Sequence, residues 1–310
     1  MKEFKKIIIA IVGFVVCFLV FDFGVGKFFD WAMSKMPSEG ERVAKSDYVI
    51  NKVEADFLVI GSSRAEAHYD SRIIQEAFPE YSVFNCGVDG QLFNYINTAF
   101  NCIMDRYSPK VVVWDVRLND LVDDTPENLS LLYPYYYQNE NVRKVLDEQD
   151  VKLKYILWSS CYRYNGTASR ILRAMRMVEN NNMGFLAQKS SDKSRKINAI
   201  KIEPNDGIKL NQKRVDALEA TLKRTKQKGI KVVLCVSPYL SRIKGVHPTI
   251  KELQRLSNEY EIPLYDMSQL DHFYEKKDYW YDGFHLDAAG ADVFTRELVE
   301  NLEKTGIEGN

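Results

Sequence analysis

The sequence lacks the patterns that mark several common classes of protein. Its 42 Lys and Arg nearly balance its 43 Asp and Glu, so the formal net charge is −1 and there is no electrostatic case for a nucleic-acid partner. Its four histidines show no His-Glu-x-x-His or comparable spacing. Its five cysteines contain no Cys-x-x-Cys pair. We therefore predict that the chain holds no metal, uses no cofactor and binds no nucleic acid.

Cysteine is sparse, and the sequence leaves its oxidation state open. Cys17 lies in an apolar run near the N-terminus, and the four further cysteines permit three disulfide pairings in an oxidising compartment. Cys235 lies in an apolar, strand-like run, where a buried thiol outside any disulfide is the ordinary expectation. The pairing of Cys86, Cys102, Cys161 and Cys235 is therefore undecided at this point.

A long uncharged run extends from Ile7 to Phe21, with lysines before it and Asp22 after it. Its fifteen residues fall short of the roughly 20 that a membrane-spanning helix needs. The run reaches that length at Gly26 if Asp22 lies near the outer surface of the membrane. The preceding lysines predict a cytoplasmic N-terminus. We expect residues 1–30 to form an uncleaved signal anchor, a transmembrane helix that ties the chain to the membrane.

A cleaved signal peptide is the alternative, because Gly24-Val25-Gly26 fits a small-x-small cleavage motif. We favour the anchor, since the apolar run is at the long limit for the core of a signal peptide. In either case the rest of the chain is exported, to the bacterial periplasm or the cell surface. Residues 31–55 contain Pro, Gly and charges of both signs, so we expect a polar tether there.

Short apolar runs alternate with amphipathic stretches after this tether, which is typical of a parallel sheet whose strands are joined by helices. We expect one α/β domain over residues 56–305. The alternation stops over about residues 121–210, a segment rich in Tyr and Arg and too long for an unstructured loop in a compact domain. We expect a mostly helical insertion or lid there, shaping the substrate groove. The predicted strands are Phe57–Ile60, Val83–Asn85, Lys110–Val116, Ile230–Val236 and Ile262–Tyr265.

Ser63 follows the first predicted strand, at the point where the chain passes into a helix. In an open parallel sheet, ligands bind beyond the carboxyl ends of the strands, so Ser63 is placed to meet a substrate. The alternative is structural. Ser63 and Glu66 have the spacing of a capping box, in which the serine hydroxyl satisfies an N–H group at the start of the helix. The residues around Ser63 alone leave both interpretations open.

Asp282 and His285 lie three residues apart on a Gly-containing turn near the C-terminus. A carboxylate beside an imidazole fixes its tautomer and stabilises the imidazolium, which a serine nucleophile requires of its base. The Gly-x-Ser-x-Gly elbow of α/β-hydrolases is not present around Ser63, because Ala65 stands where the second glycine would be. Ser63, His285 and Asp282 are therefore a candidate triad of another type.

Four short blocks of this chain resemble, in order, those of the SGNH or GDSL-type hydrolases. The resemblance covers about residues 55–120 and 210–302. Within the family, the chain most resembles the membrane-anchored branch linked to acylation or deacylation of cell-surface polysaccharides. It implies a three-layer α/β/α, flavodoxin-like fold with a parallel central sheet. The four blocks are Gly61–Ser63, Asn85–Gly87, Asn119–Asp120 and Asp282–His285.

The resemblance implies a role for each matched residue. Ser63 would be the nucleophile, His285 its base, and Asp282 the carboxylate that orients the base. The backbone N–H groups of Ser63 and Gly87 and the side-chain amide of Asn119 would stabilise the oxyanion. Without the resemblance, Gly87 reads as a turn glycine with positive φ, and Asn119 reads as an Asx turn at the end of a strand.

Two positions depart from the family pattern: Ser62 stands where the family usually has Asp, and Arg117 stands where it usually has Gly. The expected activity is that of a serine esterase or an O-acyltransferase acting on acyl esters, in particular acetyl esters, of cell-envelope carbohydrate. Attack by water would make the chain an esterase, whereas a sugar hydroxyl would make it a transferase served by a membrane-bound acyl-donor partner. The alternative is a carbohydrate-binding or assembly protein that keeps the fold without turnover.

Overall fold

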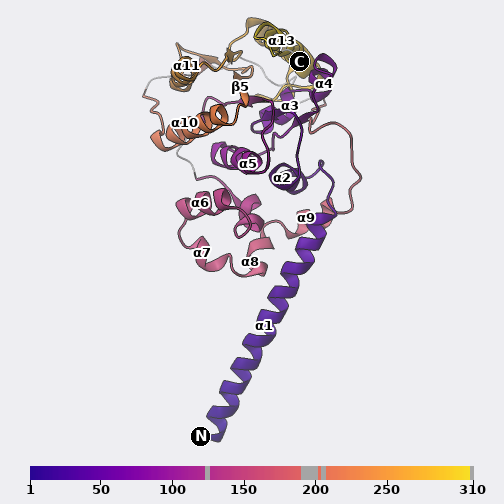
Figure 1. Ribbon diagram of the computed structural model, residues 1–310, viewed down its shortest axis with the longest axis vertical. Coiled ribbons are helices and arrows are strands. Elements are labelled where there is room, and N and C mark those ends of the chain that lie inside the picture. Colours follow the sequence, from indigo (N-terminus) through magenta and orange to yellow (C-terminus); the bar gives the residue numbers. More distant parts are fainter. Residues whose placement is uncertain (123–125, 190–201, 204–206, 308–310) are drawn as a thin grey trace. The chain divides into compact units, whose positions relative to one another are not determined.

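The computed structural model describes residues 1–122, 126–189, 202–203 and 207–307. The chain forms two compact units. Figure 1 labels many of their helices and strands. The first unit contains Met1–Asp47 and Asn128–Glu179, and the second contains Tyr48–Glu127 and Asn180–Asn310.

The second unit is built on a five-stranded sheet in which every pair of neighbouring strands is parallel. The order along the sheet is β2-β1-β3-β5-β7, which becomes 2-1-3-4-5 when only its own strands are counted, the doubly wound order of flavodoxin-like proteins. The predicted α/β class with a parallel central sheet is thereby confirmed. The strands are β1 (Phe57–Ile60), β2 (Val83–Asn85), β3 (Val111–Asp115), β5 (Lys231–Val236) and β7 (Leu264–Asp266).

Helices cover both faces of this sheet because alternate residues of each strand point to opposite sides. On one face, Phe57 and Val113 belong to the same buried core as Phe294 and Leu298 of α13. On the other face, Trp114 contacts an aromatic ring of α5 with the ring centroids 5.6 Å apart. The main helices of this unit are α3 (Ser63–His68), α4 (Ser71–Ala77), α5 (Phe93–Arg106), α10 (Gln212–Gln227), α11 (Pro248–Tyr260) and α13 (Ala288–Lys304).

A short segment covers the free edge of β2. The backbone N–H of Asn85 donates to Met183 O at 2.8 Å, and the N–H of Leu186 donates to Glu66 O at 2.9 Å. Gly184 lies between them with φ +80°, and a Cβ there would lie 2.0 Å from Asn85 O. Only glycine permits this approach, so the segment protects an otherwise unpaired sheet edge. The unit also contains the two-residue strands β4 (Ile202–Glu203) and β6 (Arg242–Ile243), and short helices α12 (Asp271–Glu275) and η3 (Lys277–Tyr279).

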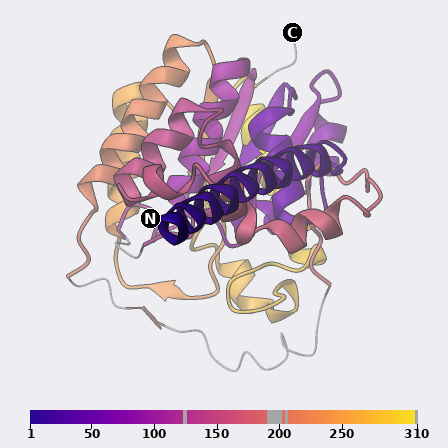
Figure 2. The ribbon, with the colours of Figure 1, turned by 90° about the horizontal axis from the view of Figure 1, so that it is seen from below.

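The first unit combines the N-terminal helix α1 (Lys2–Ser34) with the helices of the predicted insertion. The residues of α1 between Ile7 and Phe21 are exposed, and α1 is long and apolar enough to cross a membrane, as a membrane anchor or a signal sequence would be. Its C-terminal half lies beside α8 and α9, as two views show (Figures 1 and 2). The other elements are η1 (Ser130–Tyr135), α6 (Glu140–Gln149), α7 (Leu153–Ile156), α8 (Ser160–Asn165) and α9 (Ala168–Ala174).

The predicted insertion at about 121–210 contains five short helices between residues 130 and 174, joined by turns, and residues 123–125, 190–201 and 204–206 lie outside the described residues. The expected tether over 31–55 differs from the structure, because it contains helix α2 (Arg42–Asn51). The polar composition of this stretch concealed a buried side. Val43, Ala44, Val49 and Ile50 are all buried, and Asp47 accepts a hydrogen bond from Tyr135 within the first unit.

Candidate active site

Three side chains that are far apart in the sequence form one chain of hydrogen bonds in the second unit. Ser63 Oγ lies 2.8 Å from His285 Nε2. His285 Nδ1 lies 3.0 Å from Asp282 Oδ2 and 3.1 Å from Asp282 Oδ1. All three residues are partly exposed, so a small molecule can reach them from solvent. This arrangement can transfer a proton from the serine hydroxyl to the imidazole while the carboxylate stabilises the resulting charge.

The start of α3 leaves the hydroxyl of Ser63 to His285. Ser62, not Ser63, is the N-cap residue, and its Oγ accepts from the N–H of Arg64 at 3.3 Å. The carboxylate of Glu66 accepts from the N–H of Asp89 at 3.0 Å. The capping-box interpretation of Ser63 is therefore wrong. Ser63 is the first residue of the helix, a position whose backbone N–H has no acceptor within the helix.

Glycine is required where β1 turns into α3. A Cβ on Gly61 would lie 2.6 Å from the Cβ of Ala65 and 3.1 Å from the carbonyl oxygen of Asp115. No other residue could bring the end of β1 this close to the first turn of α3, so Gly61 fixes the place at which Ser63 emerges from the sheet.

The turn from Asp282 to His285 holds its own geometry. Asp282 Oδ1 accepts from the backbone N–H groups of Phe284 at 2.7 Å and His285 at 2.8 Å. Burial raises the pKa of Asp282, but the hydrogen bonds from the His285 ring and these N–H groups outweigh it, so its pKa lies below the ordinary value of 3.8. The carboxylate that faces the imidazole is therefore ionised at neutral pH.

Arg64, the residue after Ser63, connects three segments around the triad. It is buried, and its guanidinium donates to Phe284 O at 2.7 Å, to Ser237 O and Ser237 Oγ at 2.9 Å each, and to Pro238 O at 2.6 Å. The guanidinium also stacks on the ring of Tyr239, 3.8 Å from its centroid. Arg64 thus ties the start of α3 to the end of β5 and to the turn that carries His285.

A buried carboxylate lies under this network at the end of β3. Asp115 Oδ1 accepts from Tyr69 Oη at 2.7 Å and from the N–H of Ser237 at 3.1 Å. Burial raises the pKa of Asp115, and the positive charge of Arg64 opposes that rise. Arg64 and Asp115 therefore compensate each other's charge below the triad without a direct ion pair between them.

The second histidine near the triad is a structural residue. His68 is fully buried, its ring centroid lies 6.4 Å from that of His285, and its Nε2 accepts from the backbone N–H of Leu286 at 3.0 Å. Burial, together with the positive charge of Arg64 and the nearby His285, lowers the pKa of His68 well below 6.5. His68 is therefore neutral and supports the backbone immediately after His285.

This neutral histidine should make the fold sensitive to acid. Below about pH 6.5 the unfolded chain binds a proton on His68 that the folded chain does not. As the pH is lowered through this range, His68 should therefore reduce the free energy of unfolding by about 1.4 kcal/mol for each pH unit. His68→Gln keeps an acceptor for Leu286 but does not titrate. Urea unfolding at pH 7.5 and pH 5.5, followed by tryptophan fluorescence, should show a larger loss for the wild type. Equal losses in the two proteins would contradict the prediction.

Two of the predicted oxyanion donors, Gly87 and Asn119, do not point clearly at the hydroxyl of Ser63. The N–H of Gly87 donates to Asn85 Oδ1 at 2.9 Å, so the structure gives this donor an acceptor of its own. The alternative interpretation of Gly87, a turn glycine with positive φ, is wrong, because its φ is not positive. It is glycine because a Cβ would lie 2.4 Å from the backbone nitrogen of Glu66. Asn119 is exposed in the turn after β3, and among the described residues no hydrogen bond joins it to the triad.

Several residues around the triad were not singled out from the sequence. Asn85 donates to Ala65 O at 2.7 Å and to Tyr69 O at 2.9 Å, and so holds the backbone of α3 against β2. Asp120, to which no role was assigned, pairs with Arg117. The one local signal for Arg64 was a charged residue directly after the candidate nucleophile. Its partners lie 173 to 220 residues away, so only the fold could identify them.

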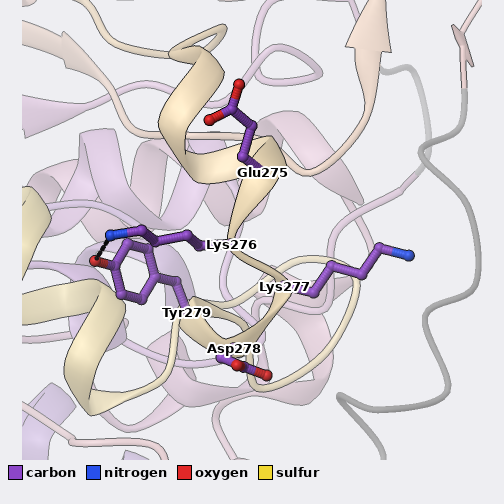
Figure 3. A pocket seen from close by; sticks show the side chains of 5 residues that line it. All are labelled: Glu275, Lys276, Lys277, Asp278 and Tyr279. Atoms are coloured by element: carbon purple, nitrogen blue, oxygen red, sulfur yellow. Dashed lines mark hydrogen bonds between the residues drawn. The ribbon is translucent and has the colours of Figure 1, made fainter.

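A shallow hollow lies beside the stretch that precedes the triad turn. It is lined by Glu275–Tyr279, and Lys276 Nζ donates to Tyr279 Oη at 3.0 Å (Figure 3). It contains none of the triad residues, so we do not place a substrate in it. Among the described residues, no group of three or more His, Cys, Asp and Glu could hold a metal ion, and none of the five cysteines forms a disulfide.

No protein-family model matches this chain, and no curated protein matches it. Its structure is similar to that of the psychrotrophic esterase EstA from Pseudoalteromonas sp., with 12% identity and a TM-score of 0.43 over 80% of this chain and 97% of that chain. A lipase/acylhydrolase from Enterococcus faecalis has 14% identity and a TM-score of 0.40 over 80% and 95%. The acetyl xylan esterase AlAXEase has 13% identity and a TM-score of 0.40 over 81% and 99%.

Proposed function

We propose that this chain is a membrane-anchored, extracytoplasmic serine esterase or O-acyltransferase of the SGNH type. The observation that carries the proposal is the continuous chain of hydrogen bonds from Ser63 Oγ through His285 to the ionised Asp282. A serine held in this way at the carboxyl end of a parallel strand is suited to acyl transfer.

The mechanism follows from these contacts. Ser63 Oγ attacks the acyl carbonyl carbon as its proton passes to His285 Nε2, and Asp282 stabilises the imidazolium through Nδ1–H. The imidazolium then protonates the leaving alcohol, and the acyl group stays on Ser63 as an ester. A second hydroxyl, from water or a sugar, gives its proton to His285 and takes the acyl group. The N–H of Ser63 is the first donor for the oxyanion, and Gly87 would have to share its N–H with Asn85.

The proposed substrate and the proposed acyl acceptor follow from the expected export of the chain and its anchor in the membrane. Acyl esters of cell-envelope carbohydrate, in particular acetyl esters, fit an exported enzyme beside a membrane. An acylated polysaccharide would be the substrate of the esterase, and a membrane-bound acyl-donor partner would serve the transferase. The engaged N–H of Gly87 and the exposed Asn119 favour one alternative, a carbohydrate-binding or assembly protein on the same fold without turnover.

Packing within the first unit supports an uncleaved anchor. Asp22 and Gly26 are buried, and a Cβ on Gly26 would lie 2.5 Å from Ser160 Oγ. Cleavage after Gly26 would remove both residues from the unit they help to build. A signal peptide that is discarded has no reason to make such contacts, so we propose that α1 is retained and spans the membrane.

The full chain, incubated with p-nitrophenyl acetate, tests the proposal. We expect release of nitrophenol and an acetyl adduct in the intact mass of the wild type, and neither in Ser63→Ala. Ser62→Ala is the matched control, because it removes the helix cap, at a cost of about 1 kcal/mol in stability, but keeps the nucleophile. An adduct that survives in Ser63→Ala would refute the assignment of Ser63. Glycan binding without any adduct in the wild type would favour the binding protein.

A further inference from the structure

The first unit has an exposed apolar edge along α7 and the start of α8. Trp158 is 50% exposed and Tyr155 is 65% exposed, and Val151 and Tyr162 are also exposed. Tyr155 lies in α7 and Tyr162 lies in α8, while Val151 and Trp158 lie in the turns that precede these two short helices. Large aromatic side chains exposed together in this way mark a surface that meets another phase or molecule.

The edge contacts α1 at a defined position along that helix, near Phe18 and Asp22. Asp22 accepts hydrogen bonds from Ser159 Oγ at 2.6 Å and from the N–H groups of Ser160 and Cys161 at 2.8 Å each. The ring of Trp158 contacts that of Phe18 with the centroids 6.5 Å apart. The start of α8 therefore lies level with Asp22, and Trp158 lies level with the end of the exposed apolar run of α1.

The length of the apolar run of α1 determines whether the edge lies in water or in the bilayer. Fifteen helical residues rise only about 22 Å, whereas the hydrocarbon core of a bilayer is about 30 Å thick. A spanning α1 that begins its apolar run at Ile7 therefore reaches the outer boundary of the hydrocarbon beyond Asp22. Phe18 lies about 6 Å deeper than Asp22. Trp158, whose ring contacts that of Phe18, must then lie on the hydrocarbon side of this boundary, in the outer half of the bilayer.

The residues of the edge suit the outer half of the bilayer, between the hydrocarbon and the head groups. Trp and Tyr are the side chains enriched where hydrocarbon meets head groups. Lys152 and Lys154 are exposed on the same stretch, and the Lys154 ammonium lies 4.7 Å from the centroid of the Tyr155 ring. Such lysines extend their charge into the head-group layer and attract anionic lipids. Asp22 remains paired with α8 and so is not exposed to lipid.

We infer that the edge formed by Val151, Tyr155, Trp158 and Tyr162 docks on the outer leaflet of the bilayer that α1 spans, with anionic head groups as its partner. The inference rests on the proposed anchoring of α1 but not on catalysis. It gives the helical insertion a second task, since the insertion then fixes how deeply the first unit sits in the membrane.

Tryptophan fluorescence of the full chain in phosphatidylcholine–phosphatidylglycerol vesicles tests the inference. Of its four tryptophans, Trp114 and Trp280 are fully buried, which leaves Trp31 and Trp158 as the exposed reporters. We expect shallow doxyl-labelled lipid to quench the wild type, and Trp158→Phe to lose most of that quenching. Trp31→Phe should retain it, because Trp31 lies about 13 Å further along α1 than Asp22.

Each other outcome has a defined meaning. Quenching of Trp158 by aqueous acrylamide but not by lipid would overturn the inference, and protection from both quenchers would assign the edge to a protein partner or a second copy of the chain. Protein that does not sediment with carbonate-washed vesicles would refute the anchor instead. Val151→Trp leaves the Phe18 contact intact and should add lipid-quenchable emission, so the inference stays testable if Trp158→Phe misfolds.

Discussion

Replacing His285 by alanine is expected to lower kcat for ester cleavage by about 10⁴-fold or more, because a serine hydroxyl without its base is a poor nucleophile at neutral pH. His285 is the group that links Ser63, at 2.8 Å, to the carboxylate of Asp282. The measurement is single-turnover release of nitrophenol from p-nitrophenyl acetate, compared between wild type and variant at equal folded concentration.

The matched control is His272→Ala. His272 is partly exposed and lies 2.7 Å from Glu297, a contact outside the triad, so its loss should leave kcat close to that of the wild type. The pH dependence adds a second check. Because the pKa of Asp282 lies below 3.8, a loss of activity that begins well above that pH cannot come from protonation of Asp282. Similar rates in His285→Ala and wild type would exclude His285 as the base.

The hydrogen-bonded arrangement of Ser63, His285 and Asp282 could be anticipated because each of these residues has a local signature. Ser63 follows an apolar strand, and Asp282 and His285 share one tight turn, so short patterns were enough to select them. The parallel sheet was predictable for the same reason, since buried parallel strands are continuous apolar runs. These features depend on contacts within a few residues or on the burial of whole segments.

The features that the sequence did not reveal depend on which side chains meet after folding. The N–H of Gly87 is engaged by a side chain only two residues away, yet that depends on how Asn85 is turned by α3. Helix α2 was hidden by polar residues that are buried in the folded unit. The attachment of α8 to Asp22 joins segments 137 residues apart, and no periodicity in either segment indicates it.

Arg64 is the clearest such residue, and its replacement carries the second large effect. We expect Arg64→Met to lower kcat by about 100-fold with a smaller change in KM, because a displacement of about 1 Å in a catalytic group can cost that much. Arg64 touches neither reacting atom. We expect it to act as a positioning residue, since its bonds to Phe284 O, Ser237 O and Pro238 O join the turn of His285 to the end of β5.

Arg64→Lys should recover part of the lost rate, because an ammonium can reach some of these carbonyls but lacks the planar fork that reaches all of them. Arg72→Met is the matched control: Arg72 is half-exposed and pairs with Asp70, outside the triad. The loss of bonds to buried carbonyls will also reduce stability, by about 1–3 kcal/mol for each unsatisfied group, so rates must be corrected for the folded fraction. If the corrected kcat of Arg64→Met equals that of Arg72→Met, Arg64 supports only the fold and the positioning role is refuted.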